Sequence, residues 1–184
     1  SAMAAPAISG PAKATAGGEV AVTVTGSADR RDFISIVPKD SKPGTYGNYQ
    51  YAENGVPKKL EVPTEPGDYE IRLLGADSPY PTLASRALRV EGVSATVDGP
   101  ASVAAGAKFD VRWTGPGNDR DYVAIGDAQR PYLDYAYTKA GNPVRLTAPD
   151  KAGSYELRYF LGNGDKLIAA RNLTVGSVTA SVSA

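Results

Sequence analysis

Acidic and amide side chains gather in a polar segment that occurs twice along the chain. Residues 26–32 read Gly-Ser-Ala-Asp-Arg-Arg-Asp, and residues 115–121 read Gly-Pro-Gly-Asn-Asp-Arg-Asp. Loops that cluster carboxylate and amide oxygens can bind Ca²⁺, which takes about six to eight oxygen ligands. The candidate ligands are Asp29, Asp32, Asn118, Asp119 and Asp121.

Arginine is interleaved with these carboxylates, and the segments lack the spaced ligand series of a calcium loop. A second interpretation is a turn in which Arg31/Asp32 and Arg120/Asp121 fix the start of the following strand. We favour the turn and predict no obligatory metal and no cofactor. Weak calcium binding at the loop oxygens stays open as the alternative.

Tyrosine is the second residue type that could form a site, with 11 residues in a chain of 184. Six of them fall on or beside one predicted strand in each half of the chain. They are Tyr46, Tyr49, Tyr51, Tyr132, Tyr135 and Tyr137. Tyrosines two residues apart share a face of a strand, and a strip of exposed rings can stack on a sugar or a partner protein. These six residues are therefore the candidate binding surface.

The opposing interpretation places one ring of each pair under the edge of the fold and treats the other rings as ordinary strand residues. Equivalent tyrosines recur in both halves of the chain. A requirement of the fold explains this recurrence as well as a binding site does. We favour the structural interpretation at this stage.

The composition argues against catalysis. The sequence has no histidine and no cysteine, which removes the usual general base and the commonest transition-metal ligands. Lys plus Arg and Asp plus Glu each number 20, and no basic run marks a nucleic-acid surface. No apolar stretch approaches the roughly 18 residues of a membrane span. We predict a protein that is not an enzyme, has no catalytic residues, binds no nucleic acid and contains no membrane span.

The two polar segments belong to an internal duplication. Residues 10–36 align with residues 99–125 with 11 identities in 27 positions, against roughly one in fifteen expected from composition. The tyrosine-bearing segments align at an offset of 86 and the last segments at 85, so the second copy carries short deletions, which fall in predicted loops. The chain is predicted to hold two domains, residues 5–91 and 94–176, joined by a short linker.

Period-two alternation predicts that both domains consist of strands. Val20, Val22 and Val24 alternate with small or polar residues, and the second copy repeats this pattern over residues 109–113. Glycine (20 residues) and proline (14 residues) punctuate the chain, and no helical stripe persists. About seven short strands per copy predict an all-β fold of two tandem immunoglobulin-like Greek-key β-sandwiches.

One repeated motif supports this fold. Residues 67–72 and 153–158 both read Gly-x-Tyr-Glu-aliphatic-Arg. Tyr69 and Tyr155 are predicted to form tyrosine corners, in which a buried ring at the start of a strand returns its hydroxyl to the backbone a few residues upstream.

Two further positions concern the core. Ile71 and Leu157 stand two residues after the corner tyrosines, where antibody domains have a cysteine, so packing is expected to replace the disulfide. Trp113 aligns with Val24 and is predicted to lie in the core of the second domain.

The second copy also carries a pattern typical of a known family. Its parts are Trp-Thr-Gly-Pro-Gly-Asn at residues 113–118, Asp-Tyr-Ala-Tyr at 134–137, Leu-Thr-Ala-Pro at 146–149 and Gly-Ser-Tyr-Glu-Leu-Arg-Tyr at 153–159. This pattern resembles the tandem immunoglobulin-like repeats of secreted or periplasmic bacterial proteins, which often accompany a von Willebrand factor A domain. The first copy departs from it, because Val24 replaces the tryptophan and Ser27-Ala28 replaces Pro-Gly.

The resemblance implies a fold and a location more than an activity. The Asp-x-Ser-x-Ser metal motif of the A domain is absent, so no metal site carries over. Because Met3 follows Ser1-Ala2 and is the single methionine, we expect a fragment of a longer extracytoplasmic bacterial protein. We predict a non-catalytic spacer or protein-interaction module, periplasmic or at the cell surface, that contacts protein or other domains of its parent chain. The alternative is a carbohydrate-binding module that uses the surface tyrosines.

Overall fold

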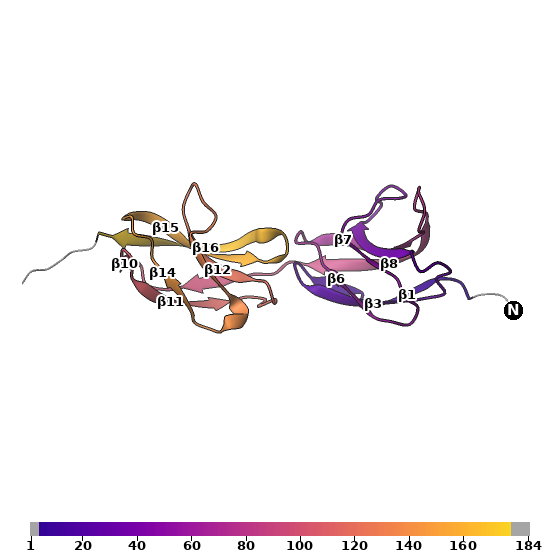
Figure 1. Ribbon diagram of the computed structural model, residues 1–184, viewed down its shortest axis with the longest axis horizontal. Helices are drawn as coiled ribbons and strands as arrows, with labels where there is room; N and C mark the ends of the chain where they lie inside the picture. The colour runs from indigo at the N-terminus through magenta and orange to yellow at the C-terminus, as the bar shows by residue number, and fades with distance from the viewer. Residues whose placement is uncertain (1–3, 178–184) are drawn as a thin grey trace, which may run out of the picture. The chain divides into compact units, whose positions relative to one another are not determined.

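The computed structural model describes residues 4–177, so Ser1 to Met3, on which the expectation of a fragment rests, lie outside the described residues. The chain divides into two compact units between Gly92 and Val93. We refer to them as the N-terminal and C-terminal units (Figure 1). Each unit is built of strands, and the predicted all-β fold of two sandwiches is confirmed.

The N-terminal unit contains a three-stranded and a five-stranded sheet. The smaller sheet has the order β1 (Ala7–Ser9), β3 (Glu19–Thr25), β6 (Lys58–Glu61). The larger sheet has the order β2 (Lys13–Thr15), β8 (Thr82–Glu91), β7 (Gly67–Leu74), β4 (Phe33–Pro38), β5 (Tyr49–Tyr51). Neighbouring strands are antiparallel except β2 and β8, which are parallel.

The C-terminal unit repeats this topology. Its smaller sheet has the order β14 (Val144–Thr147), β11 (Lys108–Thr114), β9 (Thr96–Asp98). Its larger sheet has the order β10 (Ser102–Ala104), β16 (Lys166–Gly176), β15 (Gly153–Leu161), β12 (Tyr122–Gly126), β13 (Asp134–Tyr137). Two short 3₁₀ turns, Thr138–Ala140 and Asn163–Asp165, follow β13 and β15. No helix in the described part of the chain has the length and apolar character needed to cross a membrane.

Within residues 4–177 each unit has eight strands, where the sequence predicts about seven, because the opening strand is divided between the two sheets. β1 pairs with β3, and β2 pairs with β8 on the other sheet. Gly10-Pro11 separates the two segments, as Gly99-Pro100 does in the C-terminal unit. Proline has no N–H for a ladder and fixes its own φ, so the chain leaves one sheet there and joins the other.

The core lies between the two sheets of each unit, and the outer face of the larger sheet is also covered locally. Every residue of β12 is buried. Val123 and Ile125 belong to the main core, whereas Tyr122 and Ala124 form a second cluster with Phe160. Because successive strand residues point to opposite faces, this second cluster lies on the outer face of the sheet. It forms the floor of the site described below.

Both tyrosine corners are confirmed. The Tyr69 hydroxyl donates to the Glu65 carbonyl oxygen at 2.8 Å, and the Tyr155 hydroxyl donates to the Lys151 carbonyl oxygen at 2.6 Å. Tyr155 is buried, whereas Tyr69 is only partly buried.

The sandwich centres contain aliphatic side chains where antibody domains have cysteine. Ile71 and Leu157 are both fully buried. Trp113 differs from its prediction, because it packs against the core but stays partly exposed, whereas Val24 is buried. The indole is larger than valine and carries an N–H, which donates to the Gly141 carbonyl oxygen at 2.9 Å near the surface.

Candidate functional site

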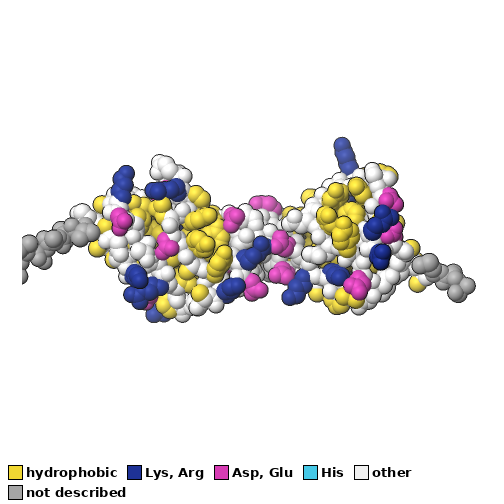
Figure 2. All heavy atoms as spheres, in the orientation of Figure 1, with side chains coloured by type: hydrophobic (Ala, Val, Ile, Leu, Met, Phe, Trp, Pro, Cys, Tyr) yellow, Lys and Arg dark blue, Asp and Glu magenta, His cyan; other side chains and the backbone are white. Residues whose placement is uncertain are grey.

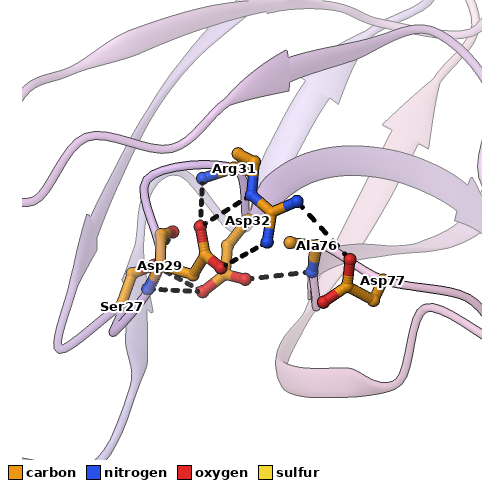
Figure 3. A network of polar contacts seen from close by, with 6 residues as sticks. All are labelled: Ser27, Asp29, Arg31, Asp32, Ala76 and Asp77. Carbon is orange, nitrogen blue, oxygen red and sulfur yellow. Dashed lines mark hydrogen bonds and ion pairs between the residues drawn. The ribbon is translucent and has the colours of Figure 1, made fainter.

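The repeated acidic segment of the N-terminal unit braces two loops. Asp32 is 3% exposed, and one carboxylate oxygen accepts hydrogen bonds from the Ser27 hydroxyl at 2.7 Å and the Asp29 backbone N–H at 3.4 Å. Its other oxygen accepts from the Ala76 backbone N–H at 3.1 Å (Figure 3). The carboxylate therefore ties the turn before β4 to the turn after β7.

Asp121 ties together the two equivalent loops of the C-terminal unit and is fully buried. One carboxylate oxygen accepts from the Tyr159 hydroxyl at 2.7 Å and the Asn118 backbone N–H at 3.0 Å. The other accepts from the Gly162 backbone N–H at 3.0 Å. Hydrogen bonds to an ionised acceptor are strong, and several of them offset the cost of burying the charge.

These contacts confirm the turn interpretation for Asp32 and Asp121. The carboxylate oxygens of Asp32 and Asp121 already accept hydrogen bonds from the protein. Among residues 4–177, the structure contains no group of three acidic, His or Cys side chains arranged to hold a metal.

Arg31 is predicted to fix the start of the following strand together with Asp32. It lies instead at the surface and forms ion pairs with two carboxylates. Its guanidinium lies 3.0 Å from the Asp29 carboxylate and 3.5 Å from the Asp77 carboxylate (Figure 3). The hydrogen bonds from Arg31 hold the pKa of Asp29 below its usual value. Exposed pairs of this kind contribute little to stability, but they orient the arginine side chain.

A buried arginine positions each tyrosine-bearing loop. The Arg158 guanidinium donates to the carbonyl oxygens of Arg130 at 3.0 Å and Pro131 at 2.9 Å, and it pairs with Glu156 at 2.7 Å. Arg72 binds the loop after β4 in the same way, through two backbone carbonyl oxygens and a 3.0 Å pair with Glu70. Sequence reasoning missed this role. The available signal was Glu-x-Arg in both motifs, since residues two apart share a face of a strand.

The N-terminal tyrosine cluster comprises Tyr46, Tyr49, Tyr51 and Tyr80 around the buried ring of Phe33. Tyr51 pairs in register with Phe33 across β5 and β4. The Phe33 ring lies 5.1 Å from the Tyr46 ring and 5.6 Å from the Tyr80 ring, in edge-to-face contacts. The four tyrosines and Phe33 line a hollow of about 240 Å³, together with Arg31 and Ala76.

The C-terminal tyrosine cluster comprises Tyr132, Tyr135 and Tyr137 above a buried floor. Tyr122 forms that floor and stacks on Phe160, with centroids 4.9 Å apart. The Tyr122 hydroxyl donates to the Asp165 carboxylate at 2.9 Å. The three tyrosines, Tyr122 and Asp165 line a hollow of about 110 Å³.

All six candidate tyrosines are exposed, from 42% for Tyr137 to 56% for Tyr51. The favoured interpretation, with one ring of each pair under the edge of the fold, is therefore wrong. Phe33 and Tyr122 occupy the covered positions instead. In Figure 2 apolar side chains, tyrosine included, gather in patches on the visible face of each unit with charged residues around them.

Hydroxyls of neighbouring tyrosines interact in pairs, and the Tyr122 hydroxyl lies against Asp165. The pKa of Tyr49 is raised by a hydrogen bond with the neighbouring Tyr51. The pKa of Tyr135 is raised by the nearby Tyr137 hydroxyl. Burial, and then the hydrogen bond to Asp165, raise the pKa of Tyr122 well above its ordinary value. The rims of the hollows are therefore polar and their walls aromatic.

The rings stand across one another and form no flat platform. Tyr46 and Tyr49 meet at 85°, and Tyr135 and Tyr137 meet at 82°. A strip of rings that stacks on a sugar needs rings that are both exposed and coplanar. These tyrosine rings are exposed but not coplanar. The arrangement supplies ring faces, ring edges and hydroxyls, which are means of binding a ligand.

A scan against protein-family models finds no match, and a search of curated proteins finds none. Similar solved structures include the Bacteroides ovatus mixed-linkage glucan utilization protein SGBP-B in complex with a heptasaccharide, at 18% identity and a TM-score of 0.31. Fibronectin(III)-like modules of Clostridium thermocellum CbhA are similar at 11% identity and a TM-score of 0.35. E. coli alpha-2-macroglobulin is similar at 13% identity and a TM-score of 0.34.

The extent of these matches varies. They cover 89%, 92% and 94% of this chain, in that order. The chain spans 43% of SGBP-B, 93% of the CbhA modules and 17% of alpha-2-macroglobulin. Similarity at these TM-scores establishes no family for this chain.

Proposed function

We propose that this chain is a non-catalytic binding module of a larger extracytoplasmic protein, and that its two tyrosine clusters contact a protein partner or another domain of the parent chain. One observation carries the proposal. Each unit exposes three tyrosines at equivalent positions around a buried aromatic floor. Exposed apolar patches rimmed by polar groups are typical of interaction sites. Tyrosine is enriched there because its rigid ring buries a large area at a low entropic cost.

The placement of the carboxylates supports a binding role without catalysis. Asp32 and Asp121 are buried and hydrogen bonded to the protein, so they are not presented to a substrate. Glu70 and Glu156 pair with Arg72 and Arg158 and help hold the tyrosine-bearing loops.

Carbohydrate is the second candidate ligand, and the exposure of the six tyrosines favours it. Rings with hydroxyls at the rim can stack on a sugar and hydrogen bond to it. The edge-to-face arrangement argues for the protein partner, because a folded surface can insert side chains between rings that stand across one another. The two candidates share a surface, so one pair of variants serves both tests.

The test compares selection on the native chain with selection on the double variant Tyr49→Ala/Tyr135→Ala. A displayed peptide library probes protein recognition, and a printed glycan array probes carbohydrate. The matched control is Glu19→Ala/Lys108→Ala, which alters exposed residues of β3 and β11 on the opposite sheet of each unit.

We expect peptides that bind the native chain and the control but not the tyrosine variant. Glycans with that pattern would establish the second candidate in place of the first. Ligands that bind all three chains equally would refute a role for the tyrosine clusters.

A further inference from the structure

The two hollows differ at one structurally equivalent position. Tyr80 lies two residues before Thr82, which pairs with Leu74, and Asp165 lies two residues before Leu167, which pairs with Phe160. Both residues have a left-handed backbone, with φ of 56° for Tyr80 and 48° for Asp165. Such a conformation is uncommon outside glycine, and here it places each side chain against the hollow. The same turn thus supplies an aromatic ring in one unit and a carboxylate in the other.

The C-terminal hollow has the walls of an aromatic cage. Tyr132 meets Tyr122 at 84° and Tyr135 at 73°, and Tyr137 meets Tyr122 at 80°. Centroid separations run from 5.3 Å for Tyr132–Tyr135 to 6.5 Å for Tyr122–Tyr137. The hollow of about 110 Å³ is several times the roughly 30 Å³ share of a water molecule. It therefore has room for a small organic group that contacts several rings at once.

The electrostatics of this hollow favour a cation. Ring faces carry partial negative charge and attract cations within about 6 Å. The Asp165 carboxylate adds a full negative charge, and the Tyr122 hydroxyl holds it in place at 2.9 Å. The Lys139 ammonium already lies 5.9 Å from the Tyr137 ring centroid.

The N-terminal hollow presents a different charged group at its lining. Arg31 lines it, held by Asp29 and Asp77, and no carboxylate is among its lining residues. Tyr80 replaces the acid with another ring. A cation entering this hollow would meet the Arg31 guanidinium, so the two units of one chain should differ in ligand charge.

We propose that the C-terminal hollow, lined by Tyr122, Tyr132, Tyr135, Tyr137 and Asp165, binds a quaternary ammonium group and that the N-terminal hollow does not. The inference rests on the proposed function, because it assigns a ligand class to one of the two tyrosine clusters. A primary ammonium has three N–H donors to satisfy, and Asp165 already accepts one hydrogen bond. A fully alkylated nitrogen has no donors and gives up little hydration when rings surround it.

The probes are choline and its neutral isostere 3,3-dimethylbutan-1-ol, each titrated into the full chain with ring-labelled tyrosine observed by NMR. We expect choline to shift the Tyr132, Tyr135 and Tyr137 signals and to bind at least about tenfold more tightly than the isostere. Asp165→Asn should weaken choline binding about tenfold, while the Glu19→Ala control, at an exposed position of β3, leaves it unchanged. Lys139→Ala, which removes the competing cation, should strengthen it.

Equal binding of choline and the isostere, or equal shifts of the N-terminal tyrosines, would overturn the inference. So would an Asp165→Asn variant that binds choline like the native chain, with unchanged Trp113 emission as evidence of an intact fold. A second arm uses a peptide containing trimethyl-lysine, and tighter binding of that peptide would identify a protein side chain as the source of the cation. If choline does not bind while selected ligands still require Tyr49 or Tyr135, the proposed function stands. The assignment of a quaternary ammonium ligand to the C-terminal hollow is then wrong.

Discussion

Replacing Asp121 by alanine should destabilise the C-terminal unit more than any nearby change in charge. The substitution removes a carboxylate that accepts hydrogen bonds from the Tyr159 hydroxyl at 2.7 Å, from the backbone N–H groups of Asn118 and Gly162 at 3.0 Å each, and from the Asn118 side-chain amide at 3.2 Å. Tyr159 is fully buried, so water cannot replace the lost partner of its hydroxyl. An unsatisfied buried donor costs about 1–3 kcal/mol.

The magnitude follows from which donors can reach water. We assign about 2 kcal/mol to the Tyr159 hydroxyl and about 1 kcal/mol to each partly buried amide. Relief of the buried charge offsets part of this cost, which leaves a loss of about 3 kcal/mol in the free energy of unfolding. Asp121→Asn keeps the shape and one acceptor oxygen, so its loss should be smaller, about 1–2 kcal/mol.

The assay is urea unfolding followed by tryptophan fluorescence. Trp113 is the only tryptophan, and its ring centroid lies 6.0 Å from that of Tyr159, so the signal reports on the C-terminal unit. With a slope of about 1 kcal/mol per molar urea, the Asp121→Ala midpoint should fall by about 3 M. The control is Asp119→Ala, an exposed carboxylate in the same loop, which should stay within about 0.5 kcal/mol of the native chain.

Equal midpoints for the Asp121→Ala and Asp119→Ala variants would refute the reasoning, because the carboxylate would then not brace the two loops. A second contrary result is a calcium-dependent rise in the native midpoint that Asp121→Ala abolishes. That result would show that the segment is a metal site and that the turn is secondary.

The tyrosine corners, a close-packed glycine, the alkaline range and calcium provide further checks. Tyr155→Phe should lower the free energy of unfolding by about 1 kcal/mol or more, as measured by urea unfolding. The loss should exceed that of Tyr69→Phe, since Tyr69 is less buried, and the reverse order would contradict this account of the corners. Gly162→Ala would place a Cβ in overlap with the Arg120 carbonyl oxygen and should cost about 2 kcal/mol or more. Gly47→Ala, with nothing within 4 Å of its Cβ, should be nearly neutral, and equal losses for the two variants would contradict the packing. Burial, and then the hydrogen bond to Asp121, raise the pKa of Tyr159 above its usual value of about 10. The contribution of Tyr159 to the free energy of unfolding is therefore complete below about pH 10 and decreases as the pH rises through that value. The Tyr159→Phe variant should lose less stability than the native chain over this pH range, as measured by urea unfolding. Thermal unfolding of the native chain in millimolar calcium and in chelator should superimpose, and a shift of more than a few degrees would contradict the turn interpretation.

The fold was predictable because several independent signals agree. The duplication, the alternation over residues 20–24 and the motif around Tyr69 and Tyr155 are all readable without coordinates. The division of the opening strand was harder to predict, since Gly10-Pro11 indicates a break but not which sheet the chain joins afterwards. The alignment with Val24 predicts a buried Trp113, and the ring packs against the core but stays partly exposed. A buried indole N–H needs an acceptor, which the alignment does not indicate.

The site was predictable in its residues but not in its geometry. Residue spacing places Tyr49 and Tyr51 on one face, but it does not show that Phe33 covers the sheet beneath them. The side chain of Arg158 reaches the carbonyl oxygens of Arg130 and Pro131, which lie 27 or more residues away in sequence. Contacts of this kind depend on strand order and loop path, which a local pattern does not contain.

The central claim is that the tyrosine clusters are the ligand-binding surface, and one measurement tests it most directly. A ligand selected on the native chain is titrated against the native chain, against Tyr49→Ala/Tyr135→Ala and against Glu19→Ala/Lys108→Ala, with urea midpoints as evidence that all three are folded. Truncation of a hot-spot tyrosine costs about 2 kcal/mol or more, and about 1.4 kcal/mol is a factor of ten in affinity. The tyrosine variant should therefore bind at least about tenfold more weakly, while the control binds as the native chain does. Equal affinity for all three chains would contradict the account, because the ligand would then contact some other surface of the two sandwiches.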